Sequence, residues 1–158
     1  MLGETLACWQ KWAVWMAVLC LATTASAQPR KDTTVEELKT RVLSASVSER
    51  APLCLEIAEK QLDAADKLYA AVESEKAQAA IMDVASFAEQ AGDSSVQTRK
   101  HQKQIEITVR KMIRRIEDIK RTVSHEEQAP LESAIDRLQH VRTDLLLSMF
   151  PGAKKDAQ

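Results

Sequence analysis

Residues 105–123 read IEITVRKMIRRIEDIKRTV, and the spacing of the apolar side chains in this stretch decides the fold class. Apolar residues recur at alternating steps of four and three, which is the period of a helix that packs along one side against other helices. They are Ile105, Val109, Met112, Ile116, Ile119 and Val123. The pattern predicts a long amphipathic helix over residues 95–124.

The segments on either side of this helix repeat the same period. A capping-box pair, Thr34 and Glu37, predicts the start of a short first helix. Gly92 is placed to end the third helix, in the manner of a C-cap glycine. The sequence leaves open whether the polar residues 73–75 separate the second helix from the third. We expect helices over residues 33–45, from 48 or 51 to 72, over 75–91 and over 130–149.

The connections between these helices are short, and consecutive helices joined in this way pack antiparallel. The chain has only three glycines, and the segments between helices lack strand-turn sequences. We therefore predict an all-α, antiparallel up-and-down bundle of three to four main helices plus a short N-terminal helix. The bundle domain is expected to cover residues 33–150, with a flexible tail over 151–158.

The N-terminal segment indicates export. Lys11 precedes an apolar run over residues 12–22, and Ala25-Ser26-Ala27 presents the small side chains that a signal peptidase requires. We predict a cleaved signal peptide over residues 1–27 and a polar leader over 28–32, which makes the protein periplasmic or secreted. The alternative is an uncleaved anchor, although the run is shorter than the roughly 20 apolar residues of a transmembrane helix.

Charge is balanced over the whole chain but divided unevenly along it. The sequence has 22 basic and 23 acidic residues, so no global field favours a nucleic acid. Residues 49–93 hold ten acids against four bases, whereas residues 95–124 hold nine bases against three acids. One interpretation is that the basic helix lies against the second and third helices and pairs with their acids. The other is that it binds an anionic partner such as lipopolysaccharide, phospholipid or an acidic protein.

Four basic residues of this helix recur at steps of seven, four and seven, which keeps them on roughly one side. They form the candidate face for an anionic partner: Lys103, Arg110, Arg114 and Arg121. Lys100, Lys111 and Arg115 are expected nearer another flank. We expect at least part of each flank to be neutralised within the bundle, which would leave only weak binding to anionic surfaces.

Cys54 is the one thiol outside the predicted signal peptide. It falls in phase with the apolar positions of the second helix, so we expect it to pack in the core, as free cysteine does. Because an odd thiol in an oxidising compartment is either hidden or paired, an intermolecular disulfide through Cys54 is the alternative.

No catalytic, cofactor or metal motif is present in the sequence. The three histidines occur in neither a His-Glu-x-x-His nor a Glu-x-x-His pattern. We therefore predict no enzyme activity, no cofactor and no metal site. The favoured hypothesis is an exported, non-catalytic interaction or structural protein of the bacterial envelope, with an unknown protein partner or self-association and no nucleic acid. Membrane contact is expected only through an uncleaved N-terminus or weak anionic-surface binding. The alternative is a ligand-, haem- or metal-binding helical bundle.

Overall fold

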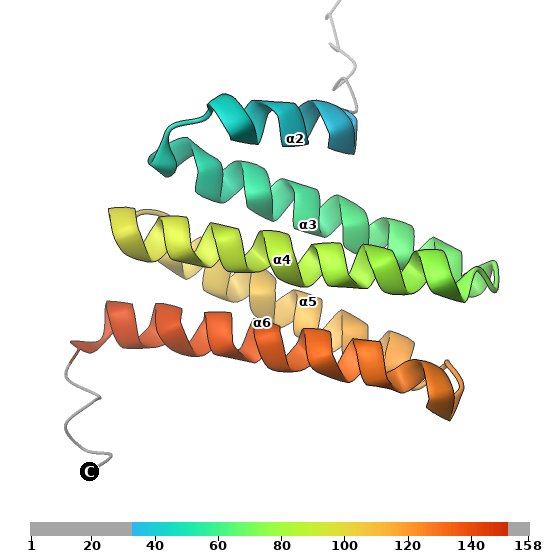
Figure 1. Ribbon diagram of the computed structural model, residues 1–158. Coiled ribbons are helices and arrows are strands. Elements are labelled where there is room, and N and C mark those ends of the chain that lie inside the picture. The colour runs from blue at the N-terminus through green and yellow to red at the C-terminus, as the bar shows by residue number, and fades with distance from the viewer. Residues whose placement is uncertain (1–32, 152–158) are drawn as a thin grey trace, which may run out of the picture. The chain divides into compact units, whose positions relative to one another are not determined.

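The computed structural model describes residues 33–151, which form an assembly of helices (Figure 1). In chain order these are α2 (Val35–Ser44), α3 (Val47–Ala70), α4 (Ser74–Thr98), α5 (Gln102–Lys120), the short 3-10 helix η1 (His125–Glu127) and α6 (Gln128–Met149). No strand occurs between residues 33 and 151. The predicted all-α class is confirmed. The predicted signal peptide over 1–27, the leader over 28–32 and all of the predicted tail except Pro151 lie outside the described residues.

The four long helices form an up-and-down bundle, as predicted (Figure 1). Helices α3 and α4 make one antiparallel hairpin, and α5 and α6 make another. The hairpins meet mainly through α4 and α6, which run parallel to each other, while α3 meets α5 over a smaller area. Consequently α4 and α5, although consecutive in the chain, contact each other far less than each contacts α6.

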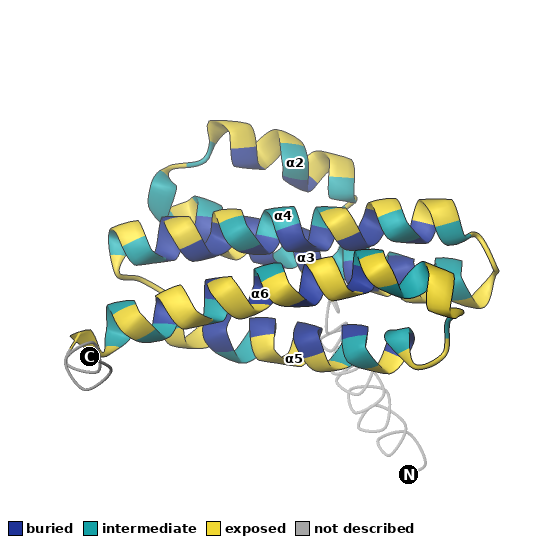
Figure 2. Ribbon diagram, turned by 60° about the horizontal axis from the view of Figure 1, so that its bottom comes forward, coloured by how far each residue is buried: buried dark blue, intermediate teal, exposed yellow. Residues whose placement is uncertain are grey.

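The predicted apolar period of α5 forms part of the bundle core. Ile105, Val109 and Ile116 are fully buried, and Met112 and Ile119 are nearly so. The core continues through leucines of α6 and through the alanines, valine and isoleucine of α4 that face inward (Figure 2). Burial of such side chains contributes roughly 1.5–3 kcal/mol each to folding, so this seam holds the two hairpins together.

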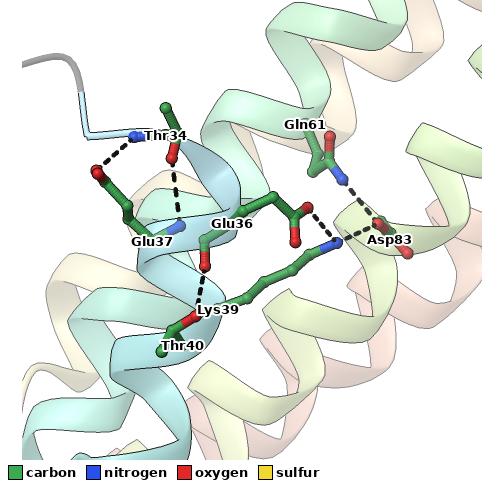
Figure 3. Close-up of polar contacts among 7 residues, drawn as sticks. All are labelled: Thr34, Glu36, Glu37, Lys39, Thr40, Gln61 and Asp83. Carbon is green, nitrogen blue, oxygen red and sulfur yellow. Dashed lines mark hydrogen bonds and ion pairs between the residues drawn. The ribbon is translucent and has the colours of Figure 1, made fainter.

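The helix α2 packs on the outside of α3 and buries two of its own side chains, Leu38 and Val42, in the core. Polar contacts hold its exposed side in place (Figure 3). Lys39 lies 3.5 Å from a carboxylate oxygen of Asp83 in α4, and its ammonium stands 5.7 Å from the centre of the Phe87 ring. Gln61 of α3 donates a hydrogen bond of 2.7 Å to the same carboxylate, so a single acid ties α2, α3 and α4 together.

The largest errors in the predicted helix ends come from Gly92, whereas the predicted end of the next helix at 124 is four residues beyond its last residue, Lys120. This glycine is buried within α4, which continues to Thr98, so it does not end the helix. The following helix accordingly begins at Gln102 instead of 95. The chain reverses through residues 99–101, where Arg99 and His101 adopt left-handed conformations with φ of 55° and 61°.

The second and third helices are separate, a point that the sequence left open: α3 ends at Ala70 and α4 begins at Ser74. Val72 has a φ of 61° and lies directly after the C-cap of α3. The amide of Val72 donates to the carbonyl of Tyr69, and the amide of Glu73 donates to that of Leu68. These two bonds make a Schellman motif, which stops α3 in the way that a glycine would.

Candidate interaction face on helix α5

The outward side of α5 is the strongest candidate for a functional surface, because its charge is only partly compensated by the rest of the bundle. The core side of the helix is occupied by the apolar seam, and its two flanks face α3 and α6. Exposed and buried bands therefore alternate along α5 in Figure 2.

The flank toward α3 shows the pairing between basic and acidic helices that the sequence led us to expect. Arg115 donates a hydrogen bond of 2.9 Å to Asp66 and also contacts Asp63, both on α3. Hydrogen bonds to Asp66 and then Asp63 raise the pKa of the Arg115 guanidinium. Because all three side chains are about half exposed, this cluster orients α5 against α3 more than it stabilises the fold.

The flank toward α6 is neutralised by a helix that the charge pattern did not indicate. Arg142 of α6 donates a hydrogen bond of 2.8 Å to Glu106, whose side chain is only 10% exposed. Lys120 pairs with Glu132 of α6 at 2.6 Å. The basic helix thus packs mainly on α6, and not on α3 and α4 together as the sequence suggested, because α6 supplies both the complementary apolar stripe and these partners.

The four predicted residues Lys103, Arg110, Arg114 and Arg121 are all exposed, at helical spacings that place them on one side of α5. Among the described residues, Arg110 pairs only with Glu106, at 3.5 Å, and Arg121, the C-cap of α5, pairs only with Asp118, at 3.0 Å. Lys103 and Arg114 have no carboxylate within 4.0 Å among residues 33–151.

Lys111 borders this surface on the side of α3. It is exposed, and it lowers the pKa of Glu59 on α3, although burial raises that pKa by more. We define the basic face by these five side chains: Lys103, Arg110, Lys111, Arg114 and Arg121.

Cys54 lies far from any such surface, within the core of α3, where none of its side chain is exposed. Burial raises the pKa of the thiol, and the nearby charge of Arg50 opposes this only in part. A protonated, enclosed thiol is a poor nucleophile. An intermolecular disulfide through Cys54 would therefore require α3 to open.

A cleft of about 610 Å³ lies between the C-terminal ends of α3 and α5, where the two helices separate. Tyr69 lines it, and within the described part of the chain the Tyr69 hydroxyl has no hydrogen-bond partner. Burial and then the charge of Glu127 raise the pKa of this phenol. Only this unpaired hydroxyl distinguishes Tyr69 from the apolar residues that pack against the core.

Residues 33–151 contain neither a metal-binding cluster nor a membrane-spanning helix. No group of three or more histidine, cysteine and carboxylate side chains in that range is arranged to hold a metal ion. Nor is any helix in it long and apolar enough to cross a membrane.

The chain matches no protein-family model, no curated protein and no solved structure. What can be inferred about function therefore depends on the surface itself.

Proposed function

We propose that this chain is an exported, non-catalytic interaction protein of the bacterial envelope that binds anionic lipid surfaces through the basic face of α5. The observation that carries the proposal is the outward position of five cations, of which Lys103 and Arg114 have no acidic partner among the described residues. A folded protein gains little stability from such unpaired surface charges, so their concentration on one side favours a role in binding.

The dimensions of the face suit a flat, charged surface. Helix α5 has 19 residues and is therefore about 28 Å long, so its cations are spread along one line rather than gathered in a pocket. Each Lys or Arg near an anionic membrane contributes about 1 kcal/mol to binding, within a Debye length of about 8 Å. Because Arg110 and Arg121 already pair with Glu106 and Asp118, the sum is smaller than five such contributions, which suits reversible association.

The composition of the face favours lipid over a protein partner. Tight protein interfaces depend on large apolar or aromatic side chains at their centre. The outward side of α5 offers only Ile107, which is itself half-buried, and α5 contains no aromatic residue. A headgroup layer needs no such anchor, because it is bound by charge and by the bidentate contacts of arginine with phosphate.

The location of the protein is supported by its sequence, through the predicted signal over residues 1–27. Export across the inner membrane would place α5 beside anionic headgroups. The charge pairs of α5 with α3 and α6 leave the outward side available for this contact.

The test is sedimentation of the purified protein with vesicles of phosphatidylcholine, with and without phosphatidylglycerol. Arg114→Glu removes a cation of the basic face, and Lys67→Glu makes the same charge change at an exposed position of α3. We expect Arg114→Glu to weaken binding to the anionic vesicles at least about tenfold, from a loss of about 2 kcal/mol for two charge units. Lys67→Glu should have a much smaller effect.

Equal weakening by both variants would mean that net charge alone governs binding. It would overturn the assignment of the lipid-binding surface to the basic face of α5. Failure of the unmodified protein to bind anionic vesicles would overturn the lipid proposal and leave an acidic protein as the partner to seek. Both variants should remain folded, because both positions are exposed and neither side chain forms an ion pair among the described residues.

A further inference from the structure

A second pocket, of about 560 Å³, lies at the end of the bundle where α5 begins. Three elements meet around it: the C-terminal end of α2, the first turns of α3 and the link between α4 and α5. This link continues directly into the basic face, since Lys103 follows it by two residues. Sequence reasoning placed no site here, because Arg41 and Lys100 are 59 positions apart in the chain.

Three basic side chains line this pocket: Arg41, Lys100 and His101. None of the three forms an ion pair with a carboxylate among residues 33–151. The only acid in the lining is Glu49, which accepts hydrogen bonds from the backbone and the hydroxyl of Ser46. These bonds lower the pKa of Glu49 and direct its carboxylate to the cap of α3. The rest of the lining is left with a surplus of positive charge.

The backbone that carries Lys100 and His101 follows a defined course. Lys100 lies between Arg99 and His101, both in the left-handed region, where non-glycine residues are uncommon. Ser95, which is fully buried in α4, donates its hydroxyl hydrogen bond to the carbonyl of Lys100. This bond fixes the course of the link over the end of α4.

We propose that this pocket binds the phosphomonoester group of a membrane lipid, and so provides a specific site beside the general contact made by the basic face. A phosphomonoester carries up to two charges and three outer oxygens, which matches the cations of Arg41 and Lys100, from two different elements, with the His101 ring beside them. Arginine adds the planar, bidentate geometry that favours phosphate. A phosphodiester presents fewer charged oxygens and stays in the plane of the headgroups, so it fits the pocket less well.

The proposal rests on the proposed function, because it assumes that α5 brings this end of the bundle to a membrane. Its test compares vesicles that contain phosphatidic acid with vesicles that contain phosphatidylglycerol, adjusted to equal zeta potential. The variants are Arg41→Gln and Lys100→Gln in the full chain, with Lys67→Gln as the control for loss of one exposed charge.

We expect the parent protein to prefer phosphatidic acid by about tenfold, the effect of one or two charge-assisted hydrogen bonds. Arg41→Gln and Lys100→Gln should abolish this preference and leave binding to phosphatidylglycerol nearly unchanged, whereas Lys67→Gln should keep it. Absence of a preference in the parent, or its persistence in both pocket variants, would overturn the proposal.

Titration with glycerol 3-phosphate, followed by phosphorus NMR, separates this pocket from the proposed function. If the parent fails to bind any anionic vesicle, the proposed function is overturned. In that case, saturable binding of glycerol 3-phosphate that is lost in Arg41→Gln would still support a phosphate-binding pocket. Its ligand would then be a soluble phosphomonoester and not a lipid. Absence of both kinds of binding would overturn the pocket as well.

Discussion

Gly92 of α4 lies directly against Val141 of α6. A Cβ atom added to Gly92 would stand 2.7 Å from Cγ1 of Val141, closer than such atoms approach in real proteins. Beside this contact, Arg137 of α6 donates two hydrogen bonds, of 2.7 and 2.6 Å, to the carboxylate of Glu89. The glycine therefore allows α4 and α6 to approach each other, and the bundle depends on this crossing because α3 and α5 touch less extensively.

Gly92→Ala is expected to destabilise the protein, although alanine favours a helix by about 1 kcal/mol over glycine. Overpacking against Val141 costs about 1–3 kcal/mol, which outweighs that gain. Urea unfolding followed by circular dichroism should show a lower midpoint with an unchanged slope. In a Val141→Ala background the clash disappears, and Gly92→Ala should then raise stability. A stabilising effect in the parent protein would show that the two helices are not held at this distance.

Val72→Gly is expected to stabilise the fold by about 1–2 kcal/mol, because a left-handed conformation carries that cost for residues with a Cβ. The side chain of Val72 is 84% exposed, so its removal loses little apolar burial. The higher flexibility of glycine in the unfolded chain offsets part of the gain. Thermal unfolding should show a higher midpoint, and Ala71→Gly, one residue earlier at a negative φ of −87°, should lower it. A lower midpoint for Val72→Gly would contradict the Schellman assignment.

Tyr69→Phe removes a buried hydroxyl that has no partner among residues 33–151. Since an unsatisfied buried polar group costs about 1–3 kcal/mol, we expect this variant to be at least as stable as the parent. The measurement is the free energy of unfolding in urea. A loss of more than about 1 kcal/mol would mean that the hydroxyl is bonded in solution.

Cys54 should react with iodoacetamide only as fast as the bundle opens, because its thiol is fully buried and its pKa is raised by that burial. Peptide mapping by mass spectrometry separates its alkylation from that of Cys8 and Cys20. The rate should rise steeply just below the unfolding midpoint in urea. Rapid labelling in native buffer would contradict this prediction and support the alternative that Cys54 forms an intermolecular disulfide.

The helical class and the basic side of α5 could be predicted because each depends on spacing within one segment. The period of the apolar residues from Ile105 to Val123 specifies both which side of α5 is buried and which side carries Lys103, Arg110, Arg114 and Arg121. A local period of this kind predicts the buried side correctly, because burial of the apolar stripe makes the largest favourable contribution to the folding free energy of the helix.

Properties that depend on a neighbouring helix could not be predicted in this way. Gly92 has the sequence context of a helix stop, and only its contact with Val141 explains why it lies inside α4. The same holds for the pairing of Glu106 with Arg142, since nothing in either segment indicates that α6 would be the partner. The pocket lined by Arg41 and Lys100 likewise exists only once α2 and the α4–α5 link are brought together.

The most direct test of the account is whether the outward side of α5 is the part of the molecule that meets the membrane. In a background with Cys8, Cys20 and Cys54 replaced by alanine, Ile107→Cys places a label one helical turn from Lys103 and Arg110. Gln90→Cys places the same label at an exposed position of α4.

With a polarity-sensitive fluorophore at each site, anionic vesicles should shift the emission of the label at 107 to shorter wavelength and leave that at 90 unchanged. Vesicles of phosphatidylcholine alone should shift neither, and salt should reverse the shift at 107, since the contact is electrostatic. An equal shift at both positions, or a shift at 90 alone, would contradict the assignment of the basic face as the membrane-binding surface.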